Sequence, residues 1–305
     1  MKKVFVGSFI GLLLASLISW MVAGRLVSPV RGEVMLPENN LPVVSFKIES
    51  QSKSVLSGWH IDARSKKGVV VLFHGIRATK LSMFKRAQLL YKHGFSVVLI
   101  DFQSHGESTG DRITMGYLEK HDVLASIDYA TSHHLGEPVG VIGVSLGGAS
   151  TLLASPQDID ALVIESVYPD ISRAVHNRVK AKLGFLSWVP AEILLAQLEP
   201  RLGFSISKLS PIEKIGSLKY PIFVISGSDD VHTTVEETRQ MYRRANEPKK
   251  LWLAKGVAHK DIYSEMPMLY EDKVIGFLAY HMKNSTEKDK KRIISKVLLG
   301  DMQND

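Results

Sequence analysis

The apolar positions of this chain form two patterns that alternate over most of its length. Short, almost wholly apolar runs occur at residues 69–74, 96–101, 138–144, 161–165, 221–227 and 250–254. Longer segments between them carry apolar residues at helical spacing, such as Phe84, Ala87 and Leu90. Buried strands joined by helices are typical of parallel sheets with right-handed crossovers. The pattern predicts an α/β fold with a mainly parallel sheet flanked by helices, opened by an antiparallel strand pair at residues 43–49 and 55–61.

The alternation breaks between residues 168 and 209, a stretch that is longer than a usual crossover and contains an apolar piece at residues 184–198. Two interpretations stay open. The first is an ordinary packed crossover helix. The second is a cap inserted over the edge of the sheet, whose apolar face would line a binding cleft. Our domain division includes the cap, at about residues 168–209.

An apolar segment without charges follows Lys2 and Lys3 and extends over residues 4–24. Its length approaches the roughly 20 residues that a membrane-spanning helix needs. We therefore predict an N-terminal membrane helix within residues 1–27. An uncleaved anchor is our preferred interpretation, with a cleaved signal peptide as the alternative. The rest of the chain would then lie outside the cytoplasm, or be secreted after cleavage.

Composition and charge restrict the remaining possibilities. With 305 residues, of which 45% are hydrophobic and 23% charged, the chain has material for one domain, at residues 43–283. A linker at residues 28–42 precedes it, and a basic tail at 284–305 follows. The absence of Cys excludes disulfides and thiol catalysis. The net charge of +7 fits solvated faces and attraction to an anionic membrane surface better than nucleic-acid binding, since no aromatic-basic platform is visible.

The strand at residues 138–144 leads into a G-x-S-x-G motif centred on Ser145 and then into a helical segment of small residues. A tight turn between a strand and a helix holds a serine in a strained, outward-pointing geometry, and the flanking glycines allow the close approach. Ser145 is therefore a candidate nucleophile. The alternative is a small residue that only packs this junction.

A carboxylate and a histidine follow in chain order. Asp229 and Asp230 come directly after the strand at 221–227, and His259 lies in the loop after the strand at 250–254. A serine hydroxyl needs a base to remove its proton, and that base needs a carboxylate to orient it. Each residue taken alone has a noncatalytic explanation: Asp230 as a residue near the start of a helix, and His259 as an ordinary loop histidine. Their order and placement together favour catalysis.

These motifs resemble those of α/β-hydrolases, in the branch of monoglyceride lipases and serine-aminopeptidase-like hydrolases. The resemblance covers about residues 43–282. Besides the serine motif, it rests on residues 72–75 (LFHG), 101–108 (DFQSHGES), 211–212 with 220–221, and 256–259 (GVAH). It implies Asp230 as the acid, three residues after Gly227. Because the sequence after Asp230 departs from the family pattern, Asp229 stays the rival.

The resemblance also implies an oxyanion hole made by the backbone N–H groups of Ile76 and Leu146. The expected activity is a serine hydrolase that cleaves a carboxylic ester, such as a lipid or acyl ester, through an acyl-enzyme on Ser145; an amide or thioester is a further option. The alternatives are an acyltransferase with the same residues and a noncatalytic binding protein. Nothing in the sequence demands a metal or an organic cofactor, and His74 and His105 are expected to have structural loop roles.

Overall fold

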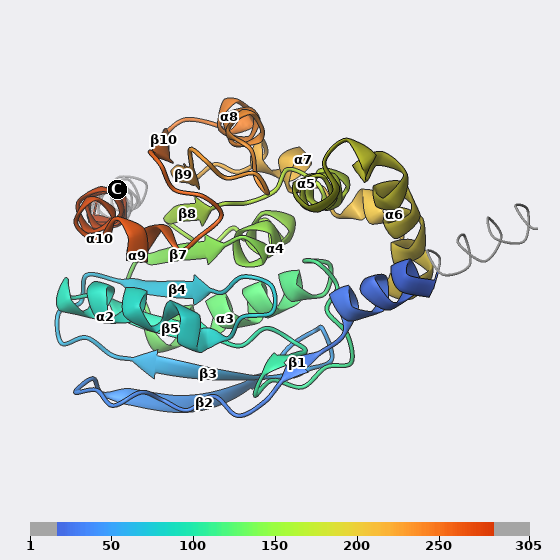
Figure 1. Ribbon diagram of the computed structural model, residues 1–305. Coiled ribbons are helices and arrows are strands. Elements are labelled where there is room, and N and C mark those ends of the chain that lie inside the picture. Colours follow the sequence, from blue (N-terminus) through green and yellow to red (C-terminus); the bar gives the residue numbers. More distant parts are fainter. Residues whose placement is uncertain (1–16, 284–305) are drawn as a thin grey trace, which may run out of the picture.

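One eight-stranded sheet lies at the centre of the molecule (Figure 1), which is known from a computed structural model that describes residues 17–283. Its strands are β2 (Val43–Glu49), β3 (Val55–Ile61), β4 (Val69–Phe73), β5 (Ser96–Ile100), β7 (Val139–Val144), β8 (Ala161–Glu165), β9 (Ile222–Gly227) and β10 (Lys249–Ala254). The strand order is β10-β9-β8-β7-β4-β5-β3-β2. Only β3 pairs in antiparallel fashion, with β2 and with β5. The predicted α/β fold with a mainly parallel sheet is confirmed.

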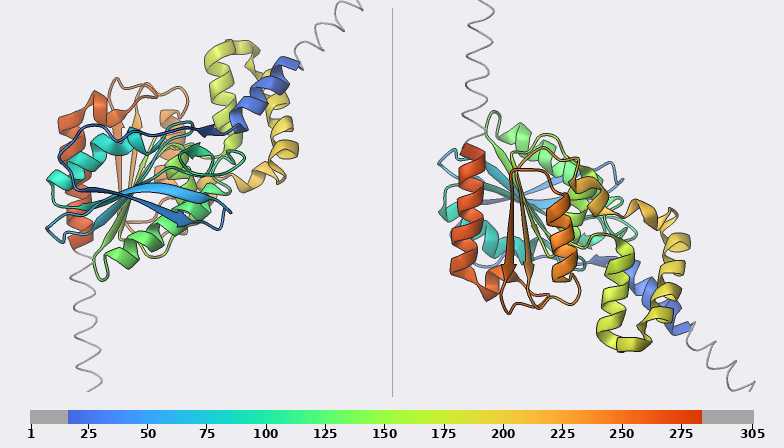
Figure 2. Two further views of the ribbon diagram at one scale, coloured as in Figure 1. Left: turned by 90° about the horizontal axis from the view of Figure 1, so that it is seen from below. Right: turned by 90° about the horizontal axis from the view of Figure 1, so that it is seen from above.

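Helices cover both faces of this sheet because successive strand residues point to opposite sides (Figure 2). In β4, Val69, Val71 and Phe73 belong to one apolar core, whereas Val70 and Leu72 belong to the other. The first face is covered by α3 (Glu119–His133), α4 (Leu146–Ala154), α7 (Pro211–Ile215) and α8 (Val235–Arg244). The second is covered by η1 (Lys80–Met83), α2 (Phe84–Lys92), α9 (Ile262–Glu265), α10 (Pro267–Tyr270) and η4 (Glu271–Ile275) with the helical residues 276–283.

The register of the parallel strands brings their carboxyl ends to one edge of the sheet. Phe73 is opposite Gly143, and Val144 is opposite Glu165. The loops that leave β4, β7, β8 and β9 therefore start side by side, although they are far apart in the sequence. In open α/β sheets, ligand-binding residues gather at this carboxyl edge.

The segment that breaks the alternation forms a projecting helical hairpin (Figure 1). It consists of α5 (Ile171–Leu183), η2 (Gly184–Ser187), α6 (Trp188–Leu202) and η3 (Ile206–Lys208). Ala191 and Leu198 of α6 are buried, whereas Phe185 at the tip is 93% exposed and Trp188 is 66% exposed. The segment is therefore more than a plain crossover helix, and we call residues 168–209 the cap.

The predicted N-terminal membrane helix is wrong, because no helix in the described range 17–283 is both long and apolar enough to cross a bilayer. Residues 17–27 are helical and lie against α6 (Figure 2). The Arg201 guanidinium lies 3.7 Å from the centre of the Trp20 ring, and the Gln197 side chain donates to Ser19 Oγ at 3.0 Å. The first 16 residues of the predicted anchor lie outside the described range.

Part of the predicted linker, residues 28–42, is built into the domain. Strand β1 (Val30–Arg31) pairs in parallel with β6 (His105–Gly106), and the Val30 N–H donates to the Ser104 carbonyl at 2.8 Å. The predicted basic tail, residues 284–305, lies outside the described residues.

Candidate functional site

Ser145 occupies the sharp turn between β7 and α4 at the carboxyl edge of the sheet. Its backbone angles are φ 48° and ψ −107°, a conformation that residues with a side chain rarely adopt. The Ser145 N–H donates to the Glu165 carbonyl at 2.8 Å, which ties this strained turn to the end of β8. The serine motif therefore has the strand-turn-helix setting that its sequence predicted.

Glycines allow this turn because the helix passes very close to the strands. A Cβ atom at Gly147 would lie 2.3 Å from the Phe73 carbonyl oxygen, and one at Gly143 would lie 2.5 Å from the Gly148 nitrogen. Both neighbours are backbone atoms, which cannot move aside without displacing α4 or β4. The two glycines that flank Ser145 thus set the closeness of α4 to the sheet.

His259 and Asp230 meet beside this turn, although 29 positions separate them in the chain. Asp230 Oδ2 lies 2.7 Å from His259 Nδ1, and Asp230 Oδ1 accepts hydrogen bonds from the backbone N–H groups of His232 and Thr233 at 2.8 Å each. Burial by itself would raise the pKa of Asp230, but the hydrogen bonds from His259 and from the two N–H groups outweigh it and lower the pKa. The carboxylate is therefore ionised at neutral pH.

The neighbouring acid has a different environment. Asp229 is exposed, and its carboxylate accepts a hydrogen bond from Ser228 Oγ at 2.7 Å. The structure thus brings Asp230 to the imidazole and leaves Asp229 at the surface.

The loop after β4 presents a free N–H group next to Ser145. His74 Nδ1 lies 2.7 Å from the Gly75 carbonyl oxygen, while His74 Nε2 accepts from the Phe102 N–H at 3.1 Å. Since a trans peptide points its C=O and N–H in opposite directions, this bond turns the Ile76 N–H away from His74. Within residues 17–283, neither this N–H nor that of Leu146 donates a hydrogen bond. Two backbone donors are therefore available beside the serine.

A cavity of about 510 Å³ contains the serine and the histidine. It is lined by Gly75, Ile76, Ala78, Leu81, Ser82, Met83, Lys85, Arg86, Val144, Ser145, Ser166, His259, Lys260, Asp261 and Ser264. No residue of the cap is among them. The cap was predicted to line the cleft over Ser145 with its apolar face, and this cavity does not show such a lining. A larger cavity, about 710 Å³, lies between the cap and α8 and contains neither Ser145 nor His259.

A buried charge network under this cavity was not foreseen from the sequence. The Arg86 guanidinium of α2 binds the Glu165 carboxylate at 2.7 Å and the Asp261 carboxylate, and it also donates to the Tyr270 hydroxyl at 3.1 Å. Glu165 ends β8, next to the backbone that holds Ser145, and Asp261 lies two positions after His259. Arg86 therefore ties the serine side of the cavity to the histidine loop. In the sequence, the one available signal of this network was Arg86 itself, an arginine on the buried face of an amphipathic helix.

Two further histidines near the edge, His74 and His105, use their ring nitrogens on the backbone. His105 Nδ1 lies 2.9 Å from the Gln103 carbonyl oxygen, and its Nε2 accepts from the Arg77 N–H at 3.1 Å. Burial and the neighbouring His105 ring lower the pKa of His74 to about 3, so the His74 ring stays neutral. With all four nitrogens engaged, these rings hold the loops after β4 and β5 in place, and neither offers a free nitrogen to a metal.

Comparison with known proteins agrees with this architecture. Residues 64–205 match the family described as serine aminopeptidase, S33. The uncharacterized protein YqkD of Bacillus subtilis is 25% identical over 249 residues, covering 80% of this chain and 81% of that protein. The uncharacterized protein Rv2307c of Mycobacterium tuberculosis is 28% identical over 253 residues, covering 79% and 82%.

Solved structures share the fold at low sequence identity. An esterase of Pyrococcus furiosus superposes with a TM-score of 0.70 at 24% identity, covering 84% of this chain and 98% of the esterase. An α/β-hydrolase of a Penicillium species superposes with a TM-score of 0.64 at 18% identity, covering 80% and 100%. Together with the strained serine turn and the strand order, these similarities show that the chain has the α/β-hydrolase fold.

Proposed function

We propose that this protein is a serine hydrolase that cleaves carboxylic esters through an acyl-enzyme on Ser145. The observation that carries the proposal is the arrangement of one cavity. It holds a serine in a strained turn and an imidazole whose Nδ1 is bound by a buried, ionised Asp230. Since Nδ1 is occupied, Nε2 is the nitrogen left to exchange a proton with the Ser145 hydroxyl.

In the acylation step, Ser145 Oγ attacks the ester carbonyl carbon while its proton passes to His259 Nε2. Asp230 stabilises the imidazolium that forms. The N–H groups of Ile76 and Leu146 bind the oxyanion of the tetrahedral intermediate. The ester C–O bond then breaks, and His259 returns the proton to the departing alkoxide, which leaves as an alcohol.

In the deacylation step, His259 takes a proton from water as the water oxygen attacks the acyl carbon. The tetrahedral intermediate collapses, the carboxylic acid leaves, and His259 returns the proton to Ser145 Oγ. Within residues 17–283, no hydrogen bond joins Ser145 Oγ to His259. Such bonds are often long in unliganded enzymes and tighten in the substrate complex.

The cavity supports a small or medium acyl ester as substrate. At about 510 Å³ it falls within the usual range for small-molecule sites, and it combines apolar side chains such as Leu81 and Met83 with polar ones. The family match and the structural similarity to the Pyrococcus furiosus esterase support the same reaction class.

The test is a p-nitrophenyl ester series of increasing acyl length, measured on the wild type, Ser145→Ala and His259→Ala. Ser217→Ala, a change at an exposed serine, is the matched control. We expect turnover that both site variants lose by several orders of magnitude and that the control keeps. Adding an acceptor alcohol distinguishes hydrolysis from acyl transfer, because a transferase forms a new ester in place of the free acid. A wild-type protein that binds the esters without turning them over would favour the binding-protein alternative.

A further inference from the structure

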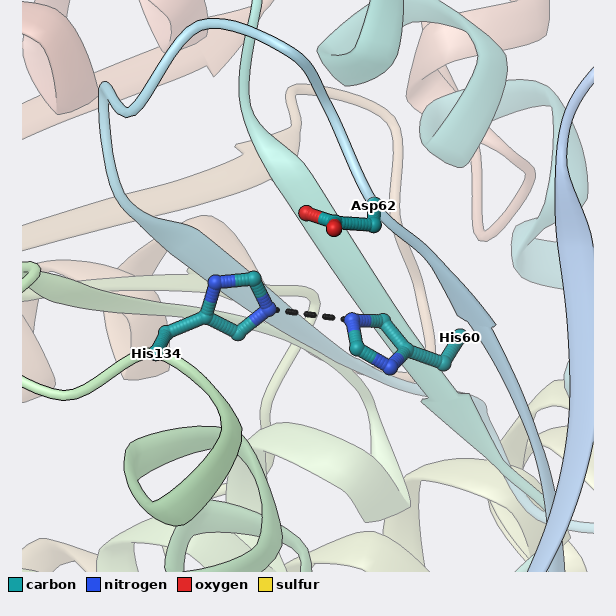
Figure 3. A group of neighbouring side chains, drawn as sticks. All are labelled: His60, Asp62 and His134. Carbon is teal, nitrogen blue, oxygen red and sulfur yellow. Dashed lines mark hydrogen bonds between the residues drawn. The ribbon is translucent and has the colours of Figure 1, made fainter.

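Figure 3 shows a second group of side chains, His60, Asp62 and His134. The group lies at the edge of the sheet opposite to that of Ser145, because the end of β3 pairs with the start of β5. His60 is near the end of β3, Asp62 follows that strand, and His134 follows α3. The His60 and His134 rings point toward one another, with their Nε2 atoms 3.0 Å apart, and the Asp62 carboxylate lies beside them. One ligand atom from each residue lies within 4.8 Å of the others.

The surroundings of His134 determine which nitrogen carries its proton. Its Nδ1 lies 3.5 Å from Glu137 Oε2, a buried carboxylate oxygen that has no hydrogen-bond partner among the described residues. A carboxylate beside Nδ1 favours the proton there, so His134 Nε2 keeps its lone pair and directs it toward His60. Carboxylate–histidine pairs of this kind orient histidines that ligate metals.

The His60 ring can take either tautomer. Its Nδ1 lies 3.4 Å from the Tyr129 hydroxyl, which is able to donate or to accept a hydrogen bond. With the proton on Nε2, His60 donates to His134 directly. With the proton on Nδ1, His60 donates to Tyr129, and both Nε2 lone pairs then face the space between the rings. The second arrangement offers two imidazole ligands to one cation.

Asp62 supplies a third ligand of the appropriate kind. It is exposed and outside the strand. Among residues 17–283, its carboxylate accepts a hydrogen bond from Ser96 Oγ alone, at 3.1 Å, so it is able to turn toward the rings. Two imidazole nitrogens and one carboxylate oxygen, completed by water, form a common set of zinc ligands. From this geometry we propose that His60, Asp62 and His134 bind a Zn²⁺ ion.

The position of the site indicates what the ion does. Its ligands belong to β3 and to the end of α3, which meet at the edge of the sheet remote from the serine cavity. A bound ion cross-links these two elements and stabilises the folded chain by mass action, since the unfolded chain does not hold the three ligands together. Ester hydrolysis at Ser145 does not use it.

The test is calorimetric titration of Zn²⁺ into the full-length protein after EDTA treatment and dialysis, with the Tm followed in parallel. The wild type is expected to bind one equivalent at this site and to gain thermal stability. Asp62→Asn and His60→Gln are expected to weaken that binding at least about 10-fold, and Glu137→Gln by about 10- to 100-fold, the usual effect of removing an outer carboxylate. Asp62 is exposed, so its variant is expected to fold even if His134→Gln does not.

His176→Gln is the matched control, because it removes a histidine of the cap far from the three ligands. Its zinc binding and Tm gain are expected to equal those of the wild type. The proposal is overturned if the wild type shows no saturable Zn²⁺ binding, or if Asp62→Asn and His60→Gln bind Zn²⁺ as tightly as the wild type does. The pair is then a direct histidine–histidine hydrogen bond.

Discussion

The Asp230 carboxylate lies 2.7 Å from Nδ1 of His259, while the adjacent Asp229 is exposed and accepts a hydrogen bond from Ser228. Consecutive residues thus have opposite environments, because the chain turns between them at the end of β9. This contrast provides a matched pair of substitutions, in which the same chemical change is made at two adjacent positions.

Asp230→Asn is expected to lower kcat for a p-nitrophenyl ester on the order of 10⁴-fold, since the amide no longer stabilises the imidazolium or its tautomer. Asp229→Asn is expected to leave kcat within a factor of about two. Steady-state kinetics on both variants, with Tm values to verify folding, make the comparison. The acid assignment is wrong if Asp229→Asn alone abolishes turnover.

The Arg86 network predicts that removing either of two positive charges of α2, Arg86 or Lys92, lowers the free energy of unfolding by unequal amounts. Arg86→Met leaves the Glu165 carboxylate buried without its cation, and removing one partner of a buried pair costs about 3–5 kcal/mol in the free energy of unfolding. Lys92→Met breaks an ion pair with Glu271 in which the lysine side chain is 69% exposed, so we expect less than about 1 kcal/mol. Urea unfolding of both variants is the measurement, and equal losses would contradict the buried role of Arg86.

Asp122 predicts a stability change with pH. Burial raises its pKa to about 7, against the hydrogen bonds from Ser50 and from the Gln103 N–H, which act to lower it. The folded state therefore keeps the Asp122 proton to higher pH than the unfolded chain does. The contribution of Asp122 to the free energy of unfolding therefore declines as the pH rises from about 4 to about 7, and it stays constant above about pH 7.

Asp122→Asn removes this titration while keeping an oxygen for the Gln103 N–H. Relative to the wild type, the variant is expected to gain up to about 4 kcal/mol in the free energy of unfolding between pH 4 and pH 8. Urea unfolding at several pH values tests this. Parallel stability curves for the two proteins would show that Asp122 does not titrate in this window.

The fold was predictable because every central strand is a short apolar run that can be buried on both faces, and the helices between them carry one apolar face. The setting of Ser145 followed from the same logic, since a glycine-flanked serine between a strand and a helix has few possible geometries. The choice between Asp229 and Asp230 was not settled by the sequence alone. A shift of one position at a turn reverses the direction of a side chain, and spacing does not report that direction.

Two features could not be found from the sequence for a related reason. Arg86, Glu165 and Asp261 come from three distant segments, and only the folded sheet brings them together. The N-terminal segment was misinterpreted because hydropathy counts apolar residues and does not report where the folded chain places them. In the folded chain Ala23 is fully buried and Trp20 lies against Arg201 of the cap, while Leu17, Ile18 and Met21 stay exposed. The extracytoplasmic location that depended on this segment stays a prediction.

Covalent labelling of Ser145 tests the proposed chemistry most directly. The full-length protein is treated with a fluorophosphonate probe, digested, and the adduct is mapped by mass spectrometry. The account predicts one adduct on Ser145, its loss in Ser145→Ala, much slower labelling in His259→Ala, and unchanged labelling in Ser217→Ala. A wild-type protein that stays unlabelled at Ser145 while it hydrolyses esters, or a Ser145→Ala variant that retains wild-type turnover, would contradict it.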